Sequence, residues 1–171
     1  MMPDFHLHPV LELKRLLLLE PAWTVAAAES LTCGIIQARL GSVSGSSGYF
    51  VGGLTAYTLE QKVRLLGVDP ERAAPVNSVS REVAEQMARG VADLFGTDFS
   101  VATTGYAEPD PVHGVAQPCA WWAVCRRREP EAVVRSGFVE VSRAERQAAQ
   151  RAVADHALAE LLRLVAGERS R

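Results

Sequence analysis

Residues 23–34 read Trp23-Thr-Val-Ala-Ala-Ala-Glu-Ser-Leu-Thr-Cys-Gly34. The apolar run over 23–28 predicts a buried strand, and residues 32–40 predict a helix that opens directly behind it. Ser30 therefore lies at a strand-to-helix turn, where a helix start presents free backbone N–H groups. This unit begins an alternation of strands and helices that continues through the chain.

Further strands are expected over residues 49–57, 98–103, 120–126 and 133–139, the last two as a hairpin. Thr58-Leu-Glu-Gln61 has the form of a capping box, Gly67 marks a helix end, and Ser80 caps a longer helix. Residues 104–118 are too rich in proline for regular structure and predict a long loop that borders the Ser30 region and is more mobile than the core.

The predicted fold is a three-layer α/β/α sandwich with a mixed central sheet. Its 171 residues, 48% of them hydrophobic, suit a single domain over 1–171. We expect an N-terminal packing helix within residues 1–20 and a closing helix over 144–165.

The composition excludes several classes of function. A net charge of −2 without a lysine-rich block gives no electrostatic footprint for nucleic acid, and we interpret Arg126-Arg-Arg128 as a solvated strand end. Three cysteines without a C-x-x-C pair argue against a disulfide framework and a zinc site, and the four histidines are scattered, so we expect no metal and no cofactor. Because no apolar run approaches the ~20 residues of a membrane span, we expect a cytoplasmic protein without a membrane partner.

Lys62 is one of only two lysines beside sixteen arginines. An amine can give up its proton near neutral pH and a guanidinium cannot, so Lys62 is a candidate general base for a Ser30 nucleophile. Its predicted place in the first turns of a helix favours the neutral amine, because the positive end of the helix lowers the pKa of a nearby ammonium. The alternative is a surface lysine whose stem covers apolar neighbours.

Ser30 also has an alternative interpretation, as the N-cap of the following helix. The two roles are compatible, because N–H groups at the helix start can hold an oxyanion, in a cradle shaped by Thr32 and Gly34. Glu29 either orients neighbouring groups or is a solvated carboxylate. Tyr57 relays a proton or binds a substrate through its hydroxyl. The alternative is an aromatic residue at a strand end whose hydroxyl faces solvent.

Several motifs together resemble the CinA C-terminal domain family. They are Ala28-Glu-Ser-Leu-Thr-Cys-Gly34, Arg39-Leu-Gly-Ser-Val-Ser-Gly-Ser-Ser47, Tyr49-Phe-Val-Gly-Gly53, Ala56-Tyr57, Lys62-Val-Arg-Leu-Leu-Gly-Val68, Val79-Ser80 and Thr104-Gly105. The resemblance implies an α/β sandwich, frequent homodimers, and hydrolysis of nicotinamide mononucleotide to nicotinate mononucleotide and ammonia. It implies catalytic roles for Ser30, Tyr57 and Lys62. The residues expected to contact the nucleotide substrate are Thr32, Gly34, Ser46, Ser47, Thr104, Gly105 and Arg143.

The chain departs from the family pattern at three places. Cys33-Gly34 replaces a pair of glycines, Tyr106-Ala-Glu-Pro109 replaces an Ile-Ala-Gly-Pro loop, and Gln147 replaces the second arginine of a G-D-R-x-x-x-R motif. A second hypothesis therefore stays open: a nucleotide-binding or regulatory homologue of the same fold with impaired catalysis.

Overall fold

The computed structural model describes residues 8–128, 130–142 and 144–171. Five strands form one sheet in the order β2-β1-β3-β4-β5. Their bounds are β1 Val25–Glu29, β2 Phe50–Thr55, β3 Phe99–Tyr106, β4 Cys119–Arg126 and β5 Val133–Glu140. Strand β1 pairs in parallel with β2 and β3, whereas β3, β4 and β5 are antiparallel. The predicted mixed sheet and the terminal hairpin are confirmed.

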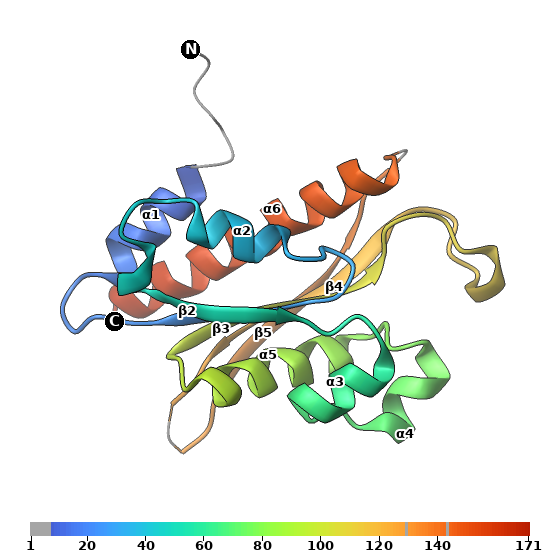
Figure 1. Cartoon of the computed structure of the whole chain (residues 1–171), viewed down its shortest axis with the longest axis horizontal. Helices are drawn as coiled ribbons and strands as arrows, with labels where there is room; N and C mark the ends of the chain where they lie inside the picture. Colours follow the sequence, from blue (N-terminus) through green and yellow to red (C-terminus); the bar gives the residue numbers. More distant parts are fainter. Residues whose placement is uncertain (1–7, 129, 143) are drawn as a thin grey trace, which may run out of the picture.

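Helices cover both faces of the sheet (Figure 1). One face carries α1 (His8–Leu17), α2 (Ile35–Gly41) and α6 (Arg146–Arg169). The other carries α3 (Leu59–Leu66), α4 (Pro70–Ala73) and α5 (Arg81–Phe95). The three-layer α/β/α prediction is therefore confirmed, and α1 lies within the N-terminal segment predicted to pack as a helix.

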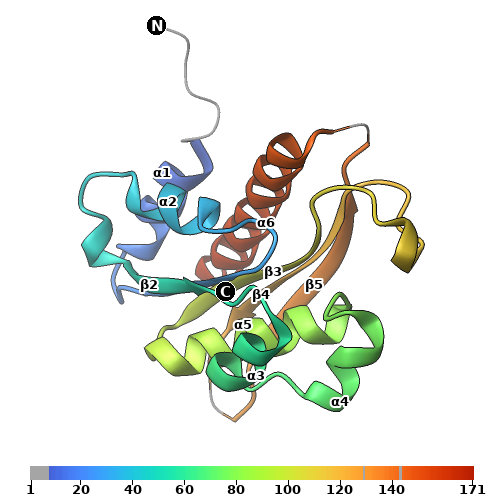
Figure 2. The ribbon, with the colours of Figure 1, turned by 45° about the vertical axis from the view of Figure 1, so that its right-hand side comes forward.

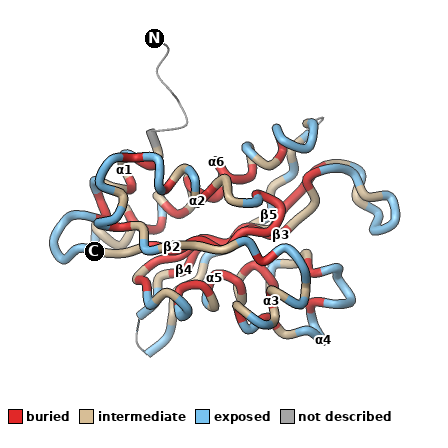
Figure 3. Tube along the Cα trace, in the orientation of Figure 1, coloured by how far each residue is buried: buried red, intermediate tan, exposed pale blue. Residues whose placement is uncertain are grey.

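Strand β1 explains why the core has two halves. All five of its residues are buried (Figure 3), and alternate side chains point to opposite faces of the sheet. Val25 and Ala27 join the core beneath α1, α2 and α6, whereas Ala26 and Ala28 join the core beneath α3 and α5. Because three of these four side chains are alanine, helices pack closely on both faces of β1.

Several predicted boundaries were wrong. The closing helix predicted over 144–165 is α6, which begins at Arg146 and continues to Arg169. The helix after β1 begins at Ile35 rather than Thr32, because Cys33 and Gly34 adopt the positive φ angles of 49° and 95° that end a turn rather than continue a helix. Strand β3 continues to Tyr106 through its pairing with β4, so the predicted loop from 104 begins three residues later. The connection beyond it projects past the carboxyl end of β1 (Figure 2).

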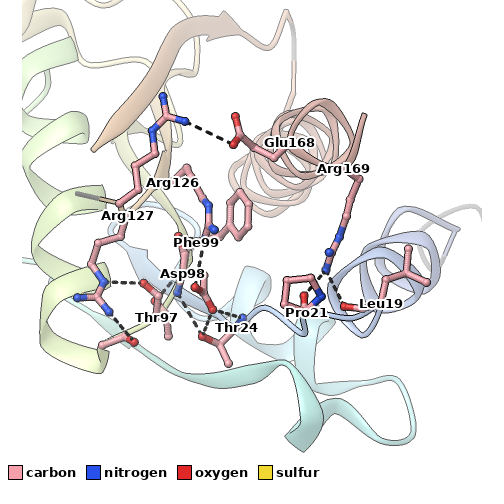
Figure 4. Close-up of polar contacts among 12 residues, drawn as sticks. Leu19, Pro21, Thr24, Thr97, Asp98, Phe99, Arg126, Arg127, Glu168 and Arg169 are labelled. Carbon is pink, nitrogen blue, oxygen red and sulfur yellow. Dashed lines mark hydrogen bonds and ion pairs between the residues drawn. The ribbon is translucent and has the colours of Figure 1, made fainter. Parts of the chain in front are cut away.

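The Arg126-Arg-Arg128 run is partly structural (Figure 4). Arg126 donates from Nη1 to Asp98 Oδ1 at 3.0 Å and stacks 4.7 Å from the Phe99 ring centroid. Arg127 donates to two backbone carbonyls just beyond the end of α5. The prediction of a solvated strand end is wrong for Arg126, whose side chain is only 15% exposed, because aromatic and acidic neighbours cover it.

Arg169 fixes the last turn of α6 to the segment between α1 and β1 (Figure 4). Its Nη2 donates to the carbonyls of Leu19 and Pro21, both at 2.9 Å, and its guanidinium lies 3.4 Å from the centroid of the Trp23 ring. Such contacts combine charge-assisted hydrogen bonds with a cation–π interaction. The last turn of the long helix is therefore tied to the segment that leads into β1.

Gly90→Ala tests how closely α5 approaches α3. A Cβ at Gly90 would overlap the Leu66 carbonyl, so the substitution should lower the free energy of unfolding by about 1–3 kcal/mol despite the better helix propensity of alanine. Gly167→Ala in α6 is the matched control, because its Cβ would meet only Arg135 Nη2 at 4.0 Å. That variant should gain up to ~1 kcal/mol. Denaturant unfolding measures both, and equal stabilisation by the two changes would contradict the packing.

Candidate active site

Lys62 and Ser30 come together at the carboxyl end of β1. Lys62 Nζ lies 3.0 Å from Ser30 Oγ, although 32 residues separate them in the chain. Both side chains are buried, with Lys62 2% and Ser30 7% exposed. The predicted contact is present, and the alternative of a surface lysine is wrong.

Helix α3 presents Lys62 to the serine. Thr58 caps the helix by accepting from the Gln61 N–H, and Gly67 ends it in the left-handed conformation at φ 66°. Lys62 lies one turn inside, and its Nζ reaches back to the carbonyls of Ala56 and Tyr57, both at 3.0 Å. The capping prediction is confirmed, and it places the amine beside the end of β2 as well as β1.

Lys62 loses its proton at a much lower pH than an ordinary lysine. Burial lowers the pKa of Lys62 from 10.5 to about 8, because the ammonium loses its hydration. The sequence argument assigned this effect to the helix dipole, whereas burial is its cause in the structure. As an ammonium the group donates to all three acceptors; as an amine it donates to the two carbonyls and leaves its lone pair for the Ser30 hydroxyl proton.

Ser30 is fixed by the strand rather than by the helix. Its N–H donates to the Thr103 carbonyl at 3.1 Å, which prolongs the pairing of β1 with β3 by one residue. Its Oγ makes no other hydrogen bond than that with Lys62 among the described residues. Gly34 occupies the N-cap position of α2, so the interpretation of Ser30 as the N-cap is wrong.

Glu29 takes over the capping. Its buried carboxylate accepts from the N–H groups of Gly34, Ile36 and Gln37 at 2.9–3.1 Å, and from the Gln37 side chain at 3.1 Å. This arrangement satisfies N–H groups that would otherwise be unpaired at the start of α2. Of the two interpretations left open for Glu29, the structure supports the orienting one and excludes a solvated carboxylate.

Three backbone N–H groups remain as candidate oxyanion donors. The N–H groups of Leu31 and Thr32 donate to no acceptor in the described part of the chain. On β3, the Phe99 N–H and the Thr103 carbonyl face β1, and every second residue of a strand faces the same edge. The N–H of Gly105 therefore points to the same side, just beyond the last residue of β1. A Cβ at Gly105 would overlap the Cys119 carbonyl, so only glycine fits there.

A cavity of about 530 Å³ opens over the Ser30–Lys62 pair. Its walls are residues 30–31, 57–59, 62, 74, 77–79, 104–111 and 146. Thr104 and Gly105, predicted to contact the substrate, line it, and so does Tyr57, for which a catalytic role was predicted. The first part of the proline-rich loop also borders it, although its mobility stays a prediction.

The structure does not bring every predicted substrate residue to this cavity. Thr32 is fully buried and its hydroxyl lies 2.8 Å from that of Thr103, so its side chain serves packing. Gly34 donates to Glu29 instead of facing the cavity. Ser46 and Ser47 precede β2 and lie at the opposite end of the sheet, because β2 runs parallel to β1. Arg143 lies outside the described residues.

Sequence reasoning assigned no role to three residues that line the cavity. Asn77 and Ser78 follow a 3-10 turn with φ angles of 49° and 59°, and the Ser78 carbonyl accepts from Thr104 Oγ1 at 2.7 Å. Non-glycine residues with such angles often occur at functional sites. Arg146 begins α6, and its signal in the sequence is that it directly precedes Gln147, which fills an arginine position of the family motif.

The described residues contain no group of three metal-ligating side chains, and none of their helices has the length and apolarity needed to cross a membrane.

Residues 10–165 match the model of the CinA C-terminal domain family. A CinA-like protein from Chlorobaculum tepidum is 53% identical over 93 residues, which are 54% of this chain and 22% of that protein. A putative competence-damage inducible protein from Moorella thermoacetica is 49% identical over 86 residues, 50% of this chain and 21% of that protein. The matched segments therefore span about a fifth of the length of these relatives.

Solved structures agree in fold. The competence/damage inducible protein from Agrobacterium tumefaciens superposes with a TM-score of 0.84 at 28% identity, covering 97% of this chain and 98% of that one. A competence damage-inducible protein from Klebsiella pneumoniae has a TM-score of 0.86 at 24% identity, covering 94% and 97%. With a family match over residues 10–165, the chain belongs to the CinA C-terminal domain family.

Proposed function

We propose that this protein is an amidohydrolase that converts nicotinamide mononucleotide and water to nicotinate mononucleotide and ammonia. The observation that carries the proposal is the 3.0 Å contact between Lys62 Nζ and Ser30 Oγ at the floor of a cavity. An amine with a pKa of about 8 is a competent base for a serine hydroxyl near neutral pH. The cavity volume of about 530 Å³ lies within the range of small-molecule sites.

The first half of the reaction forms an ester on the serine. Lys62 takes the hydroxyl proton of Ser30 while Oγ attacks the carboxamide carbon, and the N–H groups of Leu31, Thr32 or Gly105 stabilise the oxyanion. The Lys62 ammonium then gives its proton to the leaving nitrogen. The carbon–nitrogen bond breaks, ammonia departs, and Lys62 is again neutral.

Water completes the cycle by the same route. Lys62 accepts a proton from water as its oxygen attacks the ester carbon, and it returns that proton to Ser30 Oγ as the ester bond breaks. Nicotinate mononucleotide is released. The carbonyls of Ala56 and Tyr57 hold Nζ in place in both protonation states, so the base does not have to move.

A second candidate is a nucleotide-binding or regulatory protein without turnover. One observation favours it: an ion pair between Arg146 and Glu108 joins two segments of the cavity lining, and a ligand that binds Arg146 has to compete with it. Ammonia release from nicotinamide mononucleotide separates the candidates, because binding without release selects the second.

Ser30→Ala should abolish ammonia release while the protein stays folded, because it removes one hydroxyl and one hydrogen bond worth about 1 kcal/mol. Ser42→Ala is the matched control, since its exposed hydroxyl donates only to the Arg39 carbonyl, far from the cavity lining. Circular dichroism and a coupled ammonia assay measure both. Parental turnover in Ser30→Ala would remove Ser30 as the nucleophile.

Lys62→Arg should lower kcat by about 10²- to 10⁴-fold, because arginine keeps the charge but cannot act as a base in the neutral range. The chain offers one matched control, Lys14→Arg, since Lys14 is half-buried in α1, lies outside the cavity lining and donates to the Ser44 carbonyl. That variant should keep parental activity. An active Lys62→Arg enzyme would mean that Lys62 serves only as a cation.

Turnover should depend on the neutral form of Lys62. Its pKa of about 8 means that the amine is protonated below pH 8, so kcat should rise about tenfold per pH unit up to that point and then level off. Measuring kcat between pH 5.5 and 9.5 at saturating substrate tests whether kcat rises with pH in this way. A profile that is flat from pH 6 to 9 would contradict proton transfer to Lys62.

A further inference from the structure

Arg146 occupies the side of the cavity opposite α3. It is the first residue of α6, and its guanidinium donates from Nη2 to the Tyr57 hydroxyl and from Nη1 to Glu108 Oε1, both at 2.9 Å. It thus joins three separate segments: the end of β2, the loop after β3 and the start of α6. The side chain is 44% exposed, so solvent and solutes reach it.

The helix does not favour a cation at this position. The amino end of an α-helix carries partial positive charge, which destabilises a nearby guanidinium. The first turn of α6 contains no acidic residue, and Glu145 at the N-cap accepts no hydrogen bond from the helix. Glu108 supplies the negative charge that the Arg146 guanidinium contacts in the structure.

The other charged groups of the lining are already engaged. Asp110 Oδ2 lies 2.7 Å from His113 Nδ1, and Asp110 Oδ1 accepts from two N–H groups of its own loop. Lys62 is buried and bound to Ser30 and two carbonyls. Among the described residues that line the cavity, Arg146 is thus the cation that an incoming anion can reach, and Glu108 is the group it has to replace.

We propose that Arg146 is the specificity residue that binds the phosphate monoester of the substrate, and that Glu108 is a built-in competitor for the same guanidinium. The substrate class rests on the proposed function, and the exchange rests on the Arg146 contacts. A phosphate dianion carries more charge than a carboxylate and accepts from both terminal nitrogens of a guanidinium. The Tyr57 hydroxyl, which accepts from Arg146 in the structure, can donate to the same phosphate.

Glu108 therefore sets the affinity for the anion. The phosphate can bind only after the contact between Glu108 and Arg146 breaks. The favourable free energy of phosphate binding is therefore smaller by the free energy of that contact. An exposed ion pair of this kind corresponds to roughly a two- to fivefold change in affinity. Glu108 lies in the segment where Tyr106-Ala-Glu-Pro109 departs from the family pattern, so this competition is a property of this chain's own loop.

The test measures binding of ribose 5-phosphate by isothermal titration calorimetry, together with KM and kcat for nicotinamide mononucleotide. Arg146→Gln should weaken binding of ribose 5-phosphate by about tenfold or more, as expected for a lost charge-assisted hydrogen bond. Glu108→Gln should tighten it about two- to fivefold. In the double variant the Glu108 change should have no effect, because its competitor role requires Arg146.

A matched ion pair outside the cavity provides the control. Arg72 donates from Nη1 to Glu82 Oε1 at 2.6 Å, with side chains 65% and 45% exposed. Arg72→Gln and Glu82→Gln change the net charge in the same way and should leave ribose 5-phosphate affinity at the parental value. Equal effects of both pairs would assign the result to overall charge and overturn the proposal.

The remaining outcomes are also decisive. Parental affinity in Arg146→Gln, unchanged or weaker binding in Glu108→Gln, or no binding of ribose 5-phosphate by the unmodified protein at millimolar concentration would each overturn the proposal. Arg146-dependent binding without ammonia release would support it while the proposed amidase function fails. Ammonia release with a KM that neither substitution changes would support the amidase and overturn the role of Arg146.

Discussion

Burial of one amine at the end of two parallel strands is the constraint on which this site depends. The shift of the Lys62 pKa from 10.5 to about 8 corresponds to roughly 3 kcal/mol in favour of the neutral form. Such a group is tolerated inside a protein only if its hydrogen-bonding capacity is met. The carbonyls of Ala56 and Tyr57 meet it, and they leave one direction open, toward Ser30.

The topology of the sheet places this pair at an opening. After β1 the chain turns to β2 on one side, and after β3 it turns to β4 on the other. Connections that diverge in this way leave a crevice at the carboxyl ends of neighbouring parallel strands, which is where ligands bind in open α/β sheets. Ser30 follows β1, and Gly105 lies near the end of β3, so the two flank this crevice. Helices α3 and α6 close it from opposite layers, with Lys62 and Arg146.

Local sequence signals predicted the parts of the site whose geometry is local. The strand before Ser30, the Thr58 cap and the Gly67 end together determine where Lys62 lies on its helix, and each is legible from residue type and spacing. The role of Glu29 could not be decided from the sequence. A glutamate that accepts from the next helix and a glutamate that faces solvent give the same local sequence pattern. Arg146 received no role, because its partners are 38 and 89 residues away. Arg126 was likewise misinterpreted, because it is buried by contacts with residues distant in the sequence. Ser46 and Ser47 were predicted to contact the substrate, but the parallel pairing of β1 and β2 places them at the opposite end of the sheet.

The titration of Lys62 itself is the most direct measurement of this account. The chain has two lysines, so a protein labelled with ¹³C at the lysine Cε should give two side-chain resonances in an NMR pH titration, and Lys14→Arg assigns them. The account predicts that Lys62 titrates with a pKa of about 8, well below the ordinary lysine value of about 10.4. If the Lys62 resonance titrates near about 10.4 instead, Lys62 remains a cation throughout the neutral range and the serine has no base.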